Sequence, residues 1–208
     1  MLTKLKKAVQ ASLKTEARIA QKAGLTPNQI SGLAIILGVA SGIAYWLAGT
    51  DTSSSGLNAA YLLSAVALLL ASGFCDALDG ALARLYNQTS VLGGFLDSLL
   101  DRYVDAAVFI GLILGGFCNP LWGLLALIGA LLTSYARARS EAAGVSMETV
   151  GIIERAERLL IIAVASILSL VWADVLGWSV ALLALLTNFT VLQRAIYFSR
   201  KTGSHTKE

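Results

Sequence analysis

The sequence predicts an all-α integral membrane protein with six transmembrane helices, an N-terminal amphipathic juxtamembrane helix and both termini in the cytoplasm. Composition, the spacing of uncharged stretches and the placement of basic residues support this fold class. Of the 208 residues, 56% are hydrophobic and 14% are charged, whereas soluble proteins average about 25% charged residues. This composition excludes a soluble enzyme, a disordered chain and a disulfide scaffold.

Uncharged stretches place the six spans. Asn119-Pro120 divides one long uncharged stretch into two helices, because proline ends a helix. The third and fifth spans reach full length only if their helices begin inside charged segments. The predicted spans cover about 29–49, 57–79, 93–117, 121–140, 153–173 and 176–198. We expect one domain over 1–208, with a surface helix at 1–24, a six-helix core at 25–199 and a polar tail at 200–208.

The 16 Lys and Arg residues set the orientation. All of them fall before the first span, in the final turns of the last span or after it, or beside the second and fourth connections. The other connections contain Asp51 and Asp174 and no base. By the positive-inside rule, both termini and the charged connections face the cytoplasm, in a multi-pass protein of the cell membrane. No basic cluster is large enough to predict nucleic-acid binding.

The segment Leu2–Ala23 carries apolar residues at near-helical spacing with lysines between them, and the predicted apolar face consists of Leu2, Leu5, Val9, Leu13 and Ile19. This pattern favours an amphipathic helix lying on the anionic inner leaflet. A solvated basic helix is the alternative. The following Thr26-Pro27 step suits the cap and first turn of the first span.

Five aspartates cluster in a chain that otherwise avoids charge. Asp76 and Asp79 are three residues apart, and Asp97, Asp101 and Asp105 are four apart, so each set shares one face of a helix. The two spans run antiparallel, which brings these carboxylates to the same depth near the cytoplasmic boundary. Their mutual repulsion requires protonation or divalent cations. Oxygen ligands suit Mg²⁺, Mn²⁺ or Ca²⁺ rather than zinc, and two metals would suit phosphoryl chemistry. A solvated helix end is the alternative.

Small residues and one arginine accompany the aspartates. Gly80 and Gly93 let a ligand approach the backbone, Ala83 is small, and Arg84 offers a fork for phosphate. This combination suits a diphosphate whose lipid tails stay in the bilayer.

The same residues resemble the signature of the CDP-alcohol phosphotransferases. The signature reads Asp76-Ala77-Leu78-Asp79-Gly80-Ala81-Leu82-Ala83-Arg84, with Gly93, Asp97 and Asp101 following after eight, three and three residues. The resemblance covers the whole chain. It implies transfer of a phosphatidyl-type group from a CDP-lipid to an alcohol with release of CMP, by an enzyme that is a homodimer. It also implies two divalent cations, Mg²⁺ or Mn²⁺, held by Asp76, Asp79, Asp97 and Asp101.

Further roles follow from the resemblance alone. Asp101 is implied as the base that takes the proton of the acceptor. The residues implied for the CDP-lipid are Asn28, Gln29, Ile30, Ser31, Gly80, Ala83, Arg84, Ser90 and Gly93. The lipid itself, CDP-diacylglycerol or CDP-archaeol, leaves no readable motif.

Two later segments, Ser134–Glu141 and Gly151–Arg158, resemble the branch of the family that makes phosphatidylinositol phosphate or archaetidylinositol phosphate. In that branch three basic positions hold the phosphate of the acceptor, myo-inositol 1-phosphate, and they match Arg137, Arg155 and Arg194. Three cations near a cytoplasmic cavity also fit an anionic acceptor on physical grounds. A neutral acceptor would not need them.

Several alternatives stay open at this point. The arginines could serve only the topology, with Arg155 and Arg158 paired to Glu154 and Glu157. The acceptor could be glycerol 3-phosphate with the same chemistry. More distant alternatives are an intramembrane prenyltransferase, which also uses aspartate-rich helices, and a divalent-cation carrier, because intramembrane carboxylates often mark ion paths.

Overall fold

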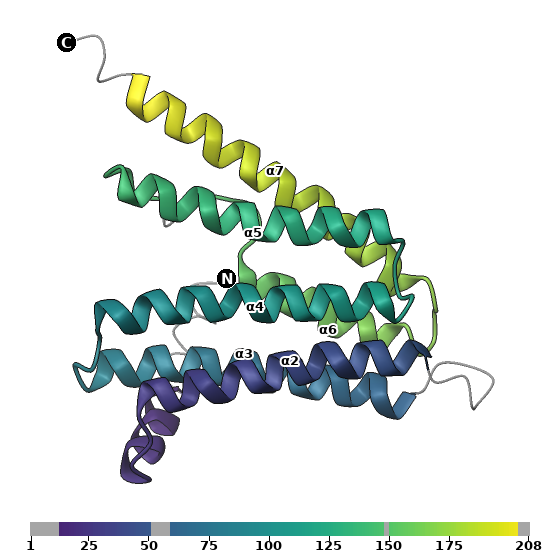
Figure 1. Cartoon of the computed structure of the whole chain (residues 1–208), viewed down its shortest axis with the longest axis horizontal. Coiled ribbons are helices and arrows are strands. Elements are labelled where there is room, and N and C mark those ends of the chain that lie inside the picture. The colour runs from purple at the N-terminus through teal and green to yellow at the C-terminus, as the bar shows by residue number, and fades with distance from the viewer. Residues whose placement is uncertain (1–12, 51–58, 148–149, 204–208) are drawn as a thin grey trace.

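The chain folds into a bundle of α-helices, described by a computed structural model over residues 13–50, 59–147 and 150–203 (Figure 1). A short helix covers 13–22. The helices that follow are α2 (Pro27–Thr50), α3 (Ala59–Leu85), α4 (Val91–Leu114), α5 (Pro120–Ala142), α6 (Arg155–Leu168) and α7 (Val175–Gly203). The predicted all-α class and the order of the six segments are confirmed. The helices end elsewhere than expected: α3 and α7 run further along the chain, and α6 stops at Leu168 rather than near 173.

Within the described residues, four helices are long and apolar enough to cross a membrane: α2, α3, α5 and α7. Helix α4 has the length, but its first half carries several charged side chains. Helix α6 has only 14 residues. These two correspond to the spans that the sequence predicts to begin inside charged segments.

Local capping explains where the helices begin. The Thr26 backbone N–H donates to Gln29 Oε1 and the Gln29 N–H donates to Thr26 Oγ1, which confirms the predicted cap of α2. Ser90 caps α4 by accepting from the Gly93 N–H at 2.9 Å. Asn119 caps α5, which begins at Pro120 as expected. Helix α4 ends earlier than the expected 117, at Leu114, with Gly115 as its C-cap.

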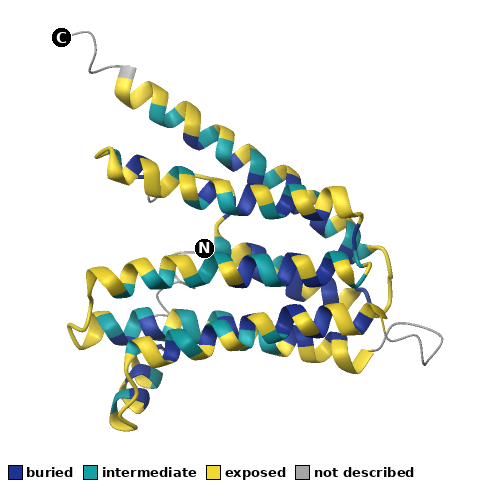
Figure 2. Ribbon diagram, in the orientation of Figure 1, coloured by how far each residue is buried: buried dark blue, intermediate teal, exposed yellow. Residues whose placement is uncertain are grey.

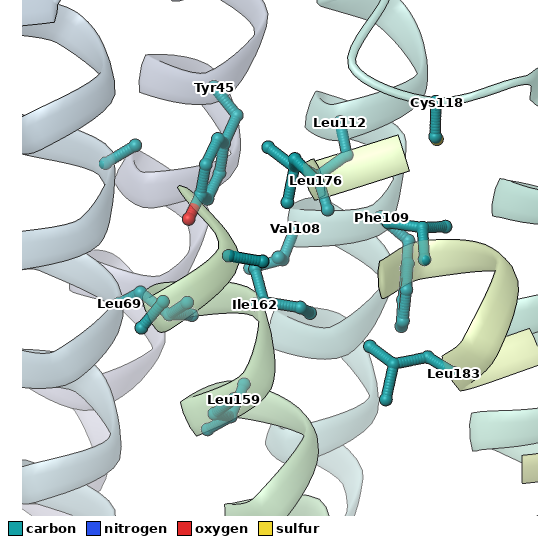
Figure 3. Packing of buried hydrophobic residues seen from close by; sticks show 14 of the residues in the cluster. Tyr45, Leu69, Val108, Phe109, Leu112, Cys118, Leu159, Ile162, Leu176 and Leu183 are labelled. Carbon is teal, nitrogen blue, oxygen red and sulfur yellow. The ribbon is translucent and has the colours of Figure 1, made fainter. Parts of the chain in front are cut away.

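The apolar core lies in the half of the bundle away from the α3–α4 turn (Figure 2). In α4, for example, the buried residues begin only at Val104. Figure 3 shows Tyr45 of α2, Phe109 of α4 and Ile162 of α6 converging in this core. The hydroxyl of Tyr45 lies 2.8 Å from the Ser166 hydroxyl, so this buried polar group has a partner.

The helices pack closely in one half of the bundle and diverge in the other half. Helix α2 packs against α3 and α4, while α5 packs mainly against α7. A side chain at Gly42 would overlap the Ala107 backbone, so α2 and α4 touch backbone to backbone there. Toward the α3–α4 turn, α5 and α7 diverge from α4 (Figure 1). Residues of α4, α5, α6 and α7 line a common cavity at that end.

The helix at 13–22 lies against the bundle. Leu13, Ala17 and Ala20 are buried, and the latter two pack with Ile30 and Leu82. Ile19, predicted for the apolar face, is 58% exposed. The first twelve residues of the predicted amphipathic segment lie outside the described residues.

Candidate active site

The predicted metal aspartates converge where α3 faces α4. Oxygens of Asp76, Asp97 and Asp101 lie within 4.8 Å of one another. Asp79 is almost fully buried, and one of its carboxylate oxygens accepts a hydrogen bond from the Ser31 hydroxyl of α2. Carboxylates from two helices thus come together, as the three- and four-residue spacings predict.

A small cavity of about 10 Å³ lies among these four aspartates. That volume is about that of a single water-sized sphere. Its polar lining consists of four carboxyl groups, the Ser31 hydroxyl and the guanidinium of Arg155. The carboxylate and hydroxyl oxygens suit a hard divalent cation such as Mg²⁺ or Mn²⁺ and do not suit zinc. In this structure Arg155 supplies the positive charge beside them.

A second cavity of about 190 Å³, the glycine-lined cavity, opens on one side of the aspartates. It lies between the start of α2, the end of α3 and the start of α4, with Arg84 as its cation. Asp79 and Asp97 form its boundary with the small cavity. Its lining includes seven of the residues predicted to hold the CDP-lipid: Asn28, Ser31, Gly80, Ala83, Arg84, Ser90 and Gly93.

Two residues predicted for the nucleotide lie elsewhere. Ile30 is buried against Ala17 and Leu82. Gln29 shares the cap of α2 with Thr26. Successive residues of a helix point in different directions, so a run of four consecutive positions cannot face one cavity.

Two glycines keep the glycine-lined cavity open. A Cβ at Gly80 would lie 3.3 Å from Arg84 Nη1, and a Cβ at Gly93 would lie 2.9 Å from Ser90 Oγ. A side chain at either position would displace the arginine or the helix cap. This requirement agrees with the choice of glycine at these positions of the predicted motif.

A third cavity of about 440 Å³, the arginine-lined cavity, opens on the other side. Helices α4, α5, α6 and α7 all contribute to it. Asp97 and Asp101 form its boundary with the small cavity. Its lining brings together the three predicted acceptor residues, Arg137, Arg155 and Arg194, and adds Arg102 and Arg158.

Arg194 is firmly held in this cavity. It is 6% exposed, its Nε donates to the Val150 carbonyl at 2.9 Å, and its Nη1 donates to the Thr133 carbonyl at 2.5 Å. Gly151, at a φ of +140°, lies beside the guanidinium. Arg137 is half-exposed and pairs with Glu141 at 2.8 Å. The predicted set therefore includes one buried cation, Arg194, and one half-exposed cation, Arg137.

Arg155 connects the arginine-lined cavity to the aspartates. Its Nη1 lies 2.5 Å from Asp101 Oδ1 and 3.0 Å from Asp76 Oδ2. Its Nε lies 3.3 Å from Asp105 Oδ1, and Arg158 Nη2 lies 2.7 Å from Asp105 Oδ2. The alternative pairing of these arginines with Glu154 and Glu157 is wrong, because those two glutamates form the capping box of α6.

Asp105 and Arg158 are polar residues of this site whose roles the sequence does not reveal. In the sequence, Asp105 is the fifth aspartate of the cluster, and Arg158 is one of the basic residues that indicate the orientation in the membrane. The four-residue step from Asp101 to Asp105 and the three-residue step from Arg155 to Arg158 were the available signal. This spacing does not show which helices face each other, so it could not predict that Asp105 and Arg158 would meet.

Comparison with known proteins decides the family. A model of the family described as CDP-alcohol phosphatidyltransferase matches residues 24–199. The chain belongs to this family. As a CDP-alcohol phosphatidyltransferase it is an enzyme, and the prenyltransferase and cation-carrier alternatives lose their support.

Two relatives of this CDP-alcohol phosphatidyltransferase are archaetidylinositol phosphate synthases. The protein from Methanothermobacter thermautotrophicus is 46% identical over 146 residues, covering 70% of this chain and 74% of the relative. The protein from Pyrococcus horikoshii is 34% identical over 201 residues, covering 97% of each chain.

Solved structures of the phosphatidylinositol phosphate synthase from Mycobacterium tuberculosis share the fold. The structure with CDP-DAG bound has a TM-score of 0.76 at 28% identity, covering 90% of this chain and 93% of that one. A second structure of the same protein contains manganese and citrate. The family is metal dependent, and the acidic cluster of this chain fits that chemistry.

Proposed function

We propose that this enzyme transfers a phosphatidyl-type group from a CDP-lipid to myo-inositol 1-phosphate and releases CMP. The observation that carries the proposal is the position of the aspartate cluster between two different cavities. The glycine-lined cavity borders it on one side, and the arginine-lined cavity borders it on the other. A transfer between two substrates needs such a shared centre.

The glycine-lined cavity suits the CDP portion of the donor. Its open backbone at Gly80 and Gly93 admits a bulky ligand, and Arg84 supplies a guanidinium fork for a phosphate. The donor is CDP-diacylglycerol or CDP-archaeol. The relatives named for archaetidylinositol phosphate and for phosphatidylinositol phosphate differ in this lipid.

The arginine-lined cavity suits an anionic acceptor. Arg194 is oriented by two backbone carbonyls before any ligand arrives, which lowers the cost of ordering it on binding. Arg137 and Arg155 complete the proposed phosphate site. Ser134 and Glu141, also in the lining, offer partners for the hydroxyls of a polyol.

Asp101 is the proposed base. It borders the small cavity and the arginine-lined cavity but not the glycine-lined cavity, so it faces the acceptor side of the cluster. The acceptor hydroxyl oxygen would bond to the phosphorus that carries the lipid, while the bond from that phosphorus to the CMP oxygen breaks. Asp101 would take the hydroxyl proton, and CMP would leave with the bonding electron pair.

The metal part of the proposal rests on the four aspartates. Asp76, Asp79, Asp97 and Asp101 would hold two divalent cations, Mg²⁺ or Mn²⁺, with Asp97, which lines both larger cavities, between the two substrates. When bound, such cations withdraw charge from a diphosphate and make CMP a better leaving group.

In the proposed membrane arrangement, the chain crosses the cell membrane six times, and the aspartates and both termini lie on the cytoplasmic side. Helices α4 and α6 would be the two spans whose charged starts form the site, shielded from lipid by their neighbours. The helix at 13–22 would lie on the inner leaflet. A homodimer is carried over from the family resemblance.

A competition assay tests the acceptor. Purified enzyme in detergent receives a CDP-lipid, Mg²⁺ and equal concentrations of labelled myo-inositol 1-phosphate and glycerol 3-phosphate. We expect the label of inositol phosphate in the lipid fraction, with one CMP released per lipid formed. Incorporation of glycerol phosphate in its place would overturn the proposed acceptor, and CMP release without a labelled lipid would overturn the transfer.

A further inference from the structure

Asp105 of α4 and Arg158 of α6 form a buried ion pair at the edge of the active site, where Arg158 also lines the arginine-lined cavity. Each residue is 2% exposed, and Asp105 lies one helical turn beyond Asp101 on α4. Asp105 contributes one oxygen to Arg158 and the other to Arg155. A continuous chain of charges therefore runs from Arg158 through Asp105 and Arg155 to Asp101.

Stability alone gives little reason for this pair. Burying two charges costs several kcal/mol per ion, and well-packed apolar residues often serve a core equally well. Arg158 also leaves its Nε buried without a hydrogen-bond partner in the described part of the chain. The arrangement therefore sacrifices some stability and calls for another explanation.

The geometry of the shared contact supplies that explanation. Asp105 binds Arg155 at Nε, the nitrogen nearest the aliphatic stem, while Nη1 contacts Asp101 and Asp76 and the residue also lines the arginine-lined cavity. Arg158 binds the second oxygen of Asp105 and thereby fixes the orientation of this carboxylate. A planar guanidinium held at Nε has little freedom left at its other end.

We propose that Asp105, held by Arg158, is a positioning residue that aims Arg155 at the phosphate of the acceptor. This inference rests on the proposed function, because it assigns Arg155 to acceptor binding. Asp105 itself does not touch the substrate, and it acts through Arg155 alone.

A double-mutant cycle tests the inference. The variants are Asp105→Asn, which keeps the shape but removes the charge, Arg155→Met, and the two combined. We measure the KM for myo-inositol 1-phosphate and the CDP-lipid, and the Kd of myo-inositol 1-phosphate by calorimetry. Asp105→Asn should weaken acceptor binding about tenfold, as expected for a hydrogen bond to a charged group, with the CDP-lipid KM within about twofold of wild type.

The combined variant decides the outcome. If Asp105 acts through Arg155, then Asp105→Asn changes the acceptor Kd by less than about twofold once Arg155 is methionine. An equal tenfold loss in both backgrounds would overturn the inference, since it would show a general structural role. If Asp105→Asn does not fold, Asp105→Ser, which also removes the carboxylate, takes its place in the same cycle, with the same two outcomes.

The outcome of this double-mutant cycle can be distinguished from the outcome of the competition assay that tests the proposed function. Should wild type use glycerol 3-phosphate instead, the proposed acceptor fails. The cycle is then run with glycerol 3-phosphate, and non-additivity still supports the positioning role. Wild-type use of inositol phosphate together with additive variants would leave the function intact and overturn the inference.

Discussion

Replacing Asp101 by asparagine is expected to lower the turnover number by about a thousandfold or more. The variant loses the proposed base, a contribution of about 10²–10⁴ in rate, and one of the four carboxylates around the small cavity. Turnover is measured as CMP release from a CDP-lipid with saturating myo-inositol 1-phosphate. Metal binding, followed by calorimetry with Mn²⁺, should persist through the three remaining aspartates.

Asp174→Asn is the matched control, because it makes the same exchange at an exposed position between α6 and α7, away from the three site cavities. It should keep wild-type turnover. If Asp101→Asn retained more than about a tenth of wild-type turnover, Asp101 could not be the base.

Replacing Arg194 by glutamine is expected to raise the KM for myo-inositol 1-phosphate about a hundredfold. Charge-assisted hydrogen bonds contribute about 1.5–3 kcal/mol each, and this guanidinium is pre-oriented by the Val150 and Thr133 carbonyls. The KM for the CDP-lipid should stay within about twofold, because Arg194 does not border the glycine-lined cavity. Steady-state kinetics with each substrate varied in turn give both values.

Arg139→Gln controls for the loss of a positive charge at the same end of the bundle. Arg139 lies on α5 two residues after Arg137 and does not line the arginine-lined cavity; it lines a neighbouring apolar groove that Arg194 also borders. It should leave both KM values unchanged. If Arg194→Gln and Arg139→Gln raised the KM for myo-inositol 1-phosphate equally, Arg194 would contribute only a general positive charge and not a specific contact with the acceptor phosphate.

Much of the fold could be predicted from this sequence, because hydropathy and helix punctuation act locally. The Asn119-Pro120 break, the Thr26 cap and the order of six apolar segments all appear as expected. The aspartate spacing also placed carboxylates of α3 and α4 face to face, since antiparallel neighbours joined by a short turn must meet.

Long-range contacts could not be predicted in the same way. That Asp105 of α4 lies between Arg155 and Arg158 of α6 depends on how these distant helices cross. The length of α6 was overestimated because its apolar sequence continues beyond Leu168, while the helix ends there in turns. For Gln29 and Ile30, carrying over a continuous motif ignored that a helix turns by about 100° per residue.

The central claim is that the two cavities hold the two substrates on opposite sides of one aspartate cluster. A structure of the enzyme with a CDP-lipid, Mn²⁺ and myo-inositol 1-phosphate tests it most directly. The account predicts the cytidine diphosphate in the glycine-lined cavity, metal density among Asp76, Asp79, Asp97 and Asp101, and the inositol phosphate beside Arg194. A nucleotide in the arginine-lined cavity, or an acceptor bound away from Asp101, would contradict it.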